Sequence, residues 1–96
     1  MQSENSPLSW LENTYALRIL VTLYREGKMF RSILYNKISK STIPLVRRVE
    51  ELKSLGLIHE ELSEFAPLSK TVSLTEKGRR VAEKVAEIEE ILREGE

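Results

Sequence analysis

The chain has 96 residues, with 15 basic and 15 acidic side chains, a formal net charge of zero and no cysteine. This length allows one domain with a modest core, and no apolar run is long enough to span a bilayer. Because neither a secretory segment nor a cysteine pair is present, disulfide stapling and export are not indicated. We therefore expect a cytoplasmic protein without a membrane partner.

Charge is unevenly distributed along the chain. The segment between Arg25 and Arg48 is basic and contains one acid, Glu26, whereas the segment from Glu83 onward is mostly glutamate. A basic middle predicts a surface that faces a polyanion. The alternative is that these charges solvate helix faces, because a neutral protein lacks the high pI common among nucleic-acid binders.

Residues 1–9 are polar and unpatterned, which predicts a flexible N-terminus. The stretch NTYALRILVTLYREG predicts the first helix, with Asn13 or Thr14 as its cap and Gly27 just beyond its end. Its apolar residues recur at the helical period, at Ala16, Ile19, Leu20 and Leu23. RSILYNKI, residues 31–38, predicts a second, short helix.

The hydroxyl-rich stretch SKST predicts a turn and a new helix start. A third helix then runs from about Thr42 to Leu55. Pro44 fits its first turn, where the backbone N–H groups have no intrahelical partner. The stripe expected to face the core consists of Leu45, Val49, Leu52 and Leu55. The residues expected mostly on the opposite side are Pro44, Arg47, Arg48 and Glu51.

Two short runs rich in β-formers follow, LIHEEL and KTVSLT, joined by a connection that contains Pro67. They predict a β-hairpin. The final stretch, TEKGRRVAEKVAEIEEILREGE, predicts a helix capped by Thr75 or Glu76. Its larger apolar residues are spaced by four, three and four, at Val81, Val85, Ile88 and Leu92, as in a short coiled coil.

Three helices, a hairpin and a last helix occur in the order of a winged helix-turn-helix domain. STIPLVRRVEELKSLGLI and VSLTEKGRRVAEKV resemble the recognition helix and the exit from the wing in MarR, PadR and HxlR-type regulators. The chain is also similar to small archaeal winged-helix dimers with a terminal coiled coil. The resemblance implies a mainly α fold with a small β-hairpin wing. It implies a winged-helix domain over residues 10–78, and a C-terminal dimerisation helix over 79–96 that continues from it.

The resemblance further implies that the third helix enters the major groove of double-stranded DNA. The residues implied to face bases are Ser41, Thr42, Pro44, Arg47 and Arg48, and those implied to face phosphates are Arg31, Lys37 and Lys40. Alternatively, Arg47 and Arg48 form intrahelical ion pairs with Glu50 and Glu51, three residues further on.

The predicted wing departs from the pattern of these regulators because it is acidic. It carries Glu60, Glu61 and Glu64 against one Lys70, and an acidic wing is expected to repel DNA. Either Lys70 contacts the DNA backbone while the glutamates face away, or the wing packs against a partner.

Operators are usually read by dimers, so the C-terminal helix is interpreted as a homodimer seam. The residues predicted for this contact are Trp10, Leu11, Val85, Ile88, Ile91 and Leu92. The alternative is that this face packs on the chain's own first helix, as expected near Val81.

The sequence gives little support for catalysis, because it has one histidine, His59, no cysteine and no aspartate. We expect no enzyme activity, no metal and no cofactor. An effector pocket is not evident, although a dimer interface could form one. The predicted function is sequence-specific double-stranded DNA binding by a homodimeric transcriptional regulator. The alternatives are a winged-helix protein-interaction module and a nonspecific, chromatin-like DNA binder.

Overall fold

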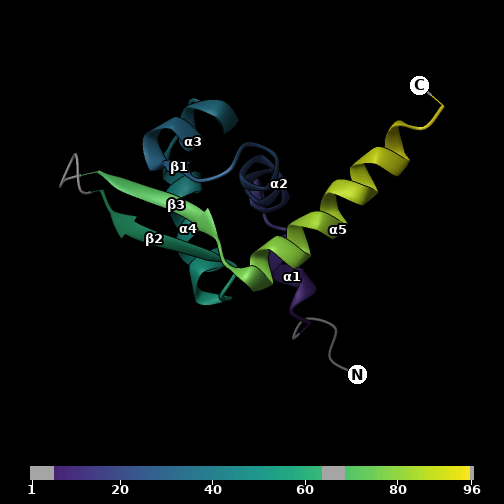
Figure 1. The fold of residues 1–96 in the computed structure, drawn as a ribbon, viewed down its shortest axis with the longest axis horizontal. Helices are drawn as coiled ribbons and strands as arrows, with labels where there is room; N and C mark the ends of the chain where they lie inside the picture. Colours follow the sequence, from purple (N-terminus) through teal and green to yellow (C-terminus); the bar gives the residue numbers. More distant parts are fainter. Residues whose placement is uncertain (1–5, 64–68, 96) are drawn as a thin grey trace.

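The computed structural model describes residues 6–63 and 69–95 (Figure 1). Residues 1–5 of the predicted flexible end, and Glu64 and Pro67 of the predicted wing tip, lie outside this part. The elements are α1 (Leu8–Leu11), α2 (Ala16–Glu26), β1 (Met29–Phe30), α3 (Arg31–Ile38), α4 (Ile43–Ser54), β2 (Ile58–Leu62), β3 (Lys70–Leu74) and α5 (Glu76–Arg93). The predicted fold class, mainly α with a small β wing, is confirmed.

The two ends of α2 differ in how far local backbone chemistry explains them. Gly27 follows α2 with φ of 87°, a conformation that glycine adopts without strain. The start of α2 differs from the prediction, because its N-cap is Tyr15, in a left-handed conformation with φ of 74°. The prediction of Asn13 or Thr14 as the cap was wrong. Both residues instead contact α4.

The sheet has three antiparallel strands in the order β1-β3-β2. In β2 and β3, Ile58 pairs with Leu74 and Leu62 with Lys70, which is the predicted hairpin. The two-residue strand β1 adds to the other edge of β3, where Met29 faces Val72. The sequence analysis missed β1 because two residues are too short to show a strand period.

The core lies where α2, α3 and α4 pack with the sheet and the first half of α5. All four apolar residues predicted for the first helix are buried in it. The largest fully buried side chains are Ile19, Leu20, Leu34, Leu45, Val49, Leu52 and Val72. This core fixes the orientation of α4, since three of its side chains are among them.

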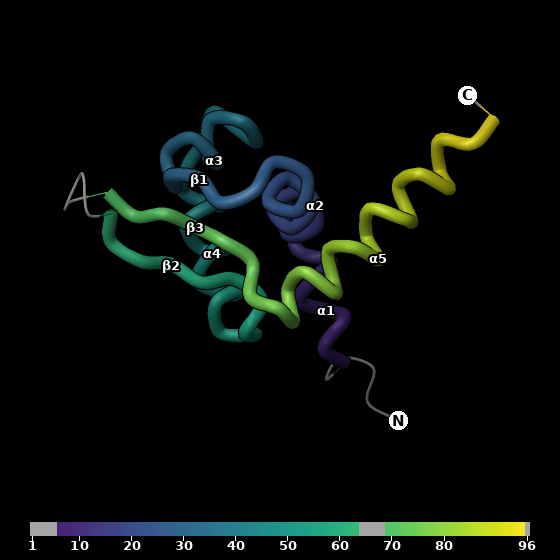
Figure 2. Tube along the Cα trace, viewed as in Figure 1, coloured from purple at the N-terminus to yellow at the C-terminus, as the bar shows by residue number. Residues whose placement is uncertain are grey.

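The last helix, α5, has two different halves. Its N-cap is Thr75, whose hydroxyl accepts a hydrogen bond from the Gly78 N–H at 2.9 Å, as predicted. Its buried residues are small: Gly78, Ala82 and Ala86. Toward its C-terminus α5 projects away from the body (Figures 1 and 2), and Ile88, Ile91 and Leu92 are exposed. In the part of the chain that is described, no helix is both long and apolar enough to cross a membrane.

Candidate nucleic-acid interface

The first two turns of α4 have one face in the core and one in solvent. Leu45 and Val49 are buried, as the stripe predicts, and they fix the rotation of the helix about its axis. Pro44 lies in the first turn and is half-buried rather than outward. The residues exposed on and just before this part of the helix are Ser41, Thr42, Ile43, Val46 and Arg47.

The adjacent arginines of α4 have different environments. The Arg48 side chain is 12% exposed, and its Nη1 lies 2.6 Å from Oε1 of Glu51. Its Nε donates a hydrogen bond of 2.8 Å to the carbonyl oxygen of Thr14. Asn13 donates to the same Glu51 oxygen at 3.1 Å. Arg48 therefore ties α4 to the segment before α2, and the prediction that it lies on the outward side with Arg47 was wrong.

Arg47 is exposed, and it has no ion-pair or hydrogen-bond partner among residues 6–63 and 69–95. The intrahelical alternative thus holds for Arg48 and not for Arg47. A planar guanidinium that is free of protein partners can form paired hydrogen bonds with phosphate or with guanine. Of the two arginines, Arg47 is the one available for DNA.

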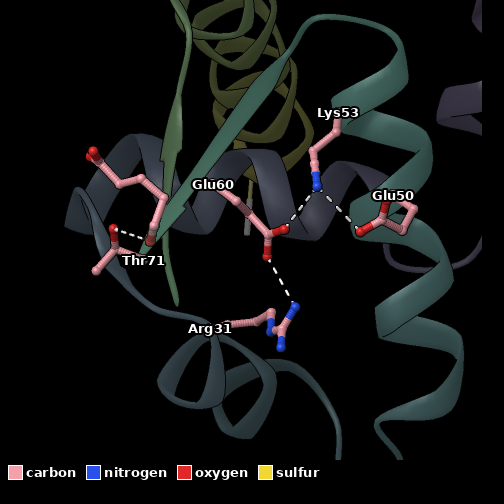
Figure 3. A network of polar contacts seen from close by, with 6 residues as sticks. Arg31, Glu50, Lys53, Glu60 and Thr71 are labelled. Atoms are coloured by element: carbon pink, nitrogen blue, oxygen red, sulfur yellow. Dashed lines mark hydrogen bonds and ion pairs between the residues drawn. The ribbon is translucent and has the colours of Figure 1, made fainter. Parts of the chain in front are cut away.

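The acidic wing is partly neutralised by an inward network of ion pairs (Figure 3). The Glu60 side chain is 3% exposed and lies 3.3 Å from Arg31 and 3.0 Å from Lys53. Lys53 also contacts Glu50 at 3.4 Å. The hydrogen bond to Glu60 raises the pKa of Lys53. The Glu60 carboxylate therefore holds β2 against α3 and α4 and does not face outward, while Glu61 remains exposed.

The other side chains predicted to contact phosphate differ in whether they already form an ion pair within the protein. Lys37 pairs with Glu26 at 2.9 Å, with both side chains close to half exposed. Lys40 is exposed and Lys70 half-buried, and neither has an ion pair within the described residues. Such surface pairs cost little to break, so Lys37 can still turn to a phosphate. Arg31 is more firmly held, by Glu60.

Comparison with known proteins identifies the family. The sequence model of the HxlR-like helix-turn-helix family matches residues 10–94. The chain belongs to this family. Among curated proteins none matches the sequence.

Several solved structures are similar to this chain. One is ytfH of Salmonella typhimurium, assigned as a transcriptional regulator, with a TM-score of 0.79 and 26% identity. The match covers 94% of this chain and 84% of that one. A protein of Thermoplasma volcanium, assigned to the HxlR family of transcriptional factors, has a TM-score of 0.79 and 22% identity. The match covers 96% of this chain and 83% of that one. AbfR, solved bound to DNA, has a TM-score of 0.67 and 20% identity. The match covers 83% of this chain and 64% of that one. The first two of these neighbours are thus assigned as transcriptional proteins, and the third is bound to DNA.

The residues predicted for dimerisation in this HxlR-like chain divide between two places. An open groove of about 760 Å³ lies between α2 and α5, with Leu11, Val85, Ile88 and Leu92 among its lining residues. Trp10 instead lines a cavity of about 330 Å³ beside α4, together with Arg47. Ile91 is exposed and lines neither. The structure thus brings four of the six residues together.

Two residues of α4 that the sequence analysis did not select, Ile43 and Val46, are exposed at its outer face. Both precede Arg47, by four and by one positions. Residues four apart lie on the same side of a helix, so Ile43 and Arg47 are neighbours on the surface. The sequence signal was available, because the buried stripe starts at Leu45 and leaves residue 43 on the opposite side.

Proposed function

We propose that this HxlR-like protein is a transcriptional regulator that binds double-stranded DNA in a sequence-dependent manner. The observation that carries the proposal is the exposed first half of α4, where Arg47 is free of protein partners. The buried Leu45 and Val49 hold this half rigidly in place. A rigid helix end that presents a free guanidinium is suited to the major groove. AbfR, with a similar fold, is bound to DNA in its solved structure.

The charges around α4 support the proposal. Lys40 precedes the helix and Lys70 begins β3, and neither has an ion pair in the described part of the chain. Contacts between such cations and phosphates provide affinity that does not depend on sequence. Glu60 is turned inward and paired with Arg31 and Lys53, which reduces the repulsion that a wing approaching DNA would meet.

We further propose that the regulator is a homodimer. The C-terminal half of α5 leaves the body of the domain (Figure 2). Ile88 and Leu92 of this half are exposed and line the groove. An exposed apolar surface of this kind is typical of a protein interface. A second copy that covers the groove would remove these side chains from water. Two-fold pairing would also present two α4 helices to successive turns of one DNA face.

Fluorescence anisotropy with a random-sequence duplex across a salt series tests the DNA proposal. We expect affinity to fall steeply as salt rises, and Arg47→Ala to weaken binding further. Arg93→Ala is the matched control, because it removes the same charge from an exposed position at the end of α5. Absence of binding at about 50 mM salt would refute the proposal. Equal losses in both variants would indicate a nonspecific charge effect.

Light scattering on Leu92→Glu tests the homodimer. We expect the wild-type chain to have the mass of two copies and the variant the mass of one, because a buried carboxylate at an apolar seam is costly. Lys84→Glu is the control, since this residue is also exposed on α5 but does not line the groove. An unchanged mass for Leu92→Glu, or a monomeric wild type, would contradict the proposed seam.

A further inference from the structure

The outer face of α4 carries two exposed branched aliphatic side chains at the end proposed to meet DNA. Ile43 is 80% exposed and Val46 is 45% exposed, and neither belongs to the core. The buried face of the same helix is already complete with Leu45 and Val49. Packing within the described residues therefore gives no reason for aliphatic residues at these two positions.

The surroundings of these two side chains are polar and basic. Ser41 and Thr42 lie at the start of the helix and are exposed, and Arg47 follows Val46 directly. The first acid along the helix, Glu50, is already shared with Lys53 at 3.4 Å. A surface that combines cations and hydroxyls with two apolar groups suits a polyanion that itself displays apolar groups. In the major groove of DNA, that group is the C5-methyl of thymine.

We infer that Ile43 and Val46 contact thymine methyl groups and select A·T pairs next to the base that Arg47 reads. This inference rests on the proposed DNA binding. Ile43 and Val46 are separated by about 4.5 Å along the helix axis, close to the spacing of about 3.4 Å between stacked bases of one strand. The two side chains are therefore matched to thymines at neighbouring or next-but-one steps. The guanidinium of Arg47 is suited to guanine beside them.

The test starts with duplexes enriched by the wild-type protein from a random-sequence pool. Each thymine of an enriched duplex is replaced in turn by deoxyuridine, which keeps the base-pairing groups and lacks only the methyl. We expect the dissociation constant to rise about four-fold at one or two positions of each half-site, as the burial of one methyl-sized group predicts. Thymines elsewhere in the duplex should be insensitive to the replacement.

The variants Ile43→Ala and Val46→Ala identify the protein side of the contact. Each should bind the thymine duplex more weakly and should lose the difference between thymine and deoxyuridine at its own position. Ile33→Ala is the control, because Ile33 is an aliphatic residue on α3 with a similar exposure of 46%. Its sensitivity to deoxyuridine should equal that of the wild type. Thermal melting of all three variants should stay close to the wild-type value, because the side chains are exposed.

The outcomes separate this inference from the function on which it rests. Selective binding to an enriched duplex with no deoxyuridine effect, or an effect that persists in both α4 variants, overturns the role of Ile43 and Val46 and leaves DNA recognition intact. Binding without enrichment of any sequence also overturns it, and supports nonspecific DNA binding. A failure to bind any duplex at low salt overturns DNA binding itself.

Discussion

Replacement of Arg48 by alanine is expected to destabilise the protein, because this arginine holds α4 to the segment before α2. The side chain makes two short contacts, 2.8 Å to the Thr14 carbonyl and 2.6 Å to Glu51. A hydrogen bond that involves a charged group contributes about 1.5–3 kcal/mol. Glu51 keeps its bond to Asn13, at 3.1 Å, and the Thr14 carbonyl can regain water at this partly open site. We therefore expect a total loss near the lower limit, about 2 kcal/mol.

For a domain of this size a loss of about 2 kcal/mol lowers the melting temperature by about 10 °C. Arg47→Ala is the matched control: it removes an identical side chain from the next position, and its melting temperature should change little because Arg47 is exposed and unpaired within the described chain. Melting by circular dichroism at equal protein concentrations gives both values, since the stability of a dimer depends on concentration.

Measured by DNA affinity, the two variants should rank in the opposite order to their melting temperatures. Well below both melting temperatures, Arg47→Ala should weaken binding by about 1–3 kcal/mol if its guanidinium meets a base. Arg48→Ala should weaken it much less, as long as α4 stays folded. A normal melting temperature for Arg48→Ala together with a large loss of DNA affinity would refute the assignment of Arg48 to a structural role.

Three further changes test the packing and the ion pairs. Gly78→Ala should destabilise the fold by more than about 2 kcal/mol in chemical denaturation, because its Cβ would overlap the Leu57 carbonyl. Glu60→Gln should cost about 1–2 kcal/mol by the same assay, because it removes the charge that Lys53 pairs with. Since the pKa of Lys53 is raised, its contribution is complete below about pH 10.4 and is lost as pH rises through the folded-state pKa. Urea unfolding at pH values above about 10.4 should thus show a smaller alkaline loss of stability in Glu60→Gln than in the wild type.

Helices α2 to α5 and the hairpin could be predicted because their signals are local, whereas the four-residue α1 was not predicted. The apolar period of α2 and the hydroxyl cluster before α4 are complete within about a dozen residues of sequence. The N-cap of α2 could not be predicted in the same way. Asn13 and Thr14 have the right chemistry for a cap, but the Asn13 side chain donates to Glu51 of a distant helix instead, and the Thr14 backbone carbonyl accepts a hydrogen bond from Arg48. Tyr15 occupies the cap position at the cost of a positive φ.

The sequence analysis did not assign Glu60 to the inward face of the wing. Strand alternation contained the missing signal. In β2, Ile58 is buried, and residues two apart lie on the same face of a strand. Glu60 therefore shares the inward face of Ile58, whereas His59 and Glu61 point outward and are exposed. What the sequence alone could not show is that Arg31 and Lys53 meet Glu60 there, because these cations come from two other helices.

The predicted stripe of α5 was defined by its large apolar residues alone. Counting only large residues selects Val85 and Leu92 and omits Gly78 and Ala82, which are the residues that face the body of the domain. Small residues allow a helix to approach closely, as the overlap of any Gly78 side chain with the Leu57 carbonyl demonstrates. Because these small residues and Val81, which packs against the core, already attach α5 to the domain, the larger apolar residues further along the helix are not needed for that attachment. They remain available to line the groove, and this division of the helix into two faces is the physical basis for placing the proposed dimer seam there.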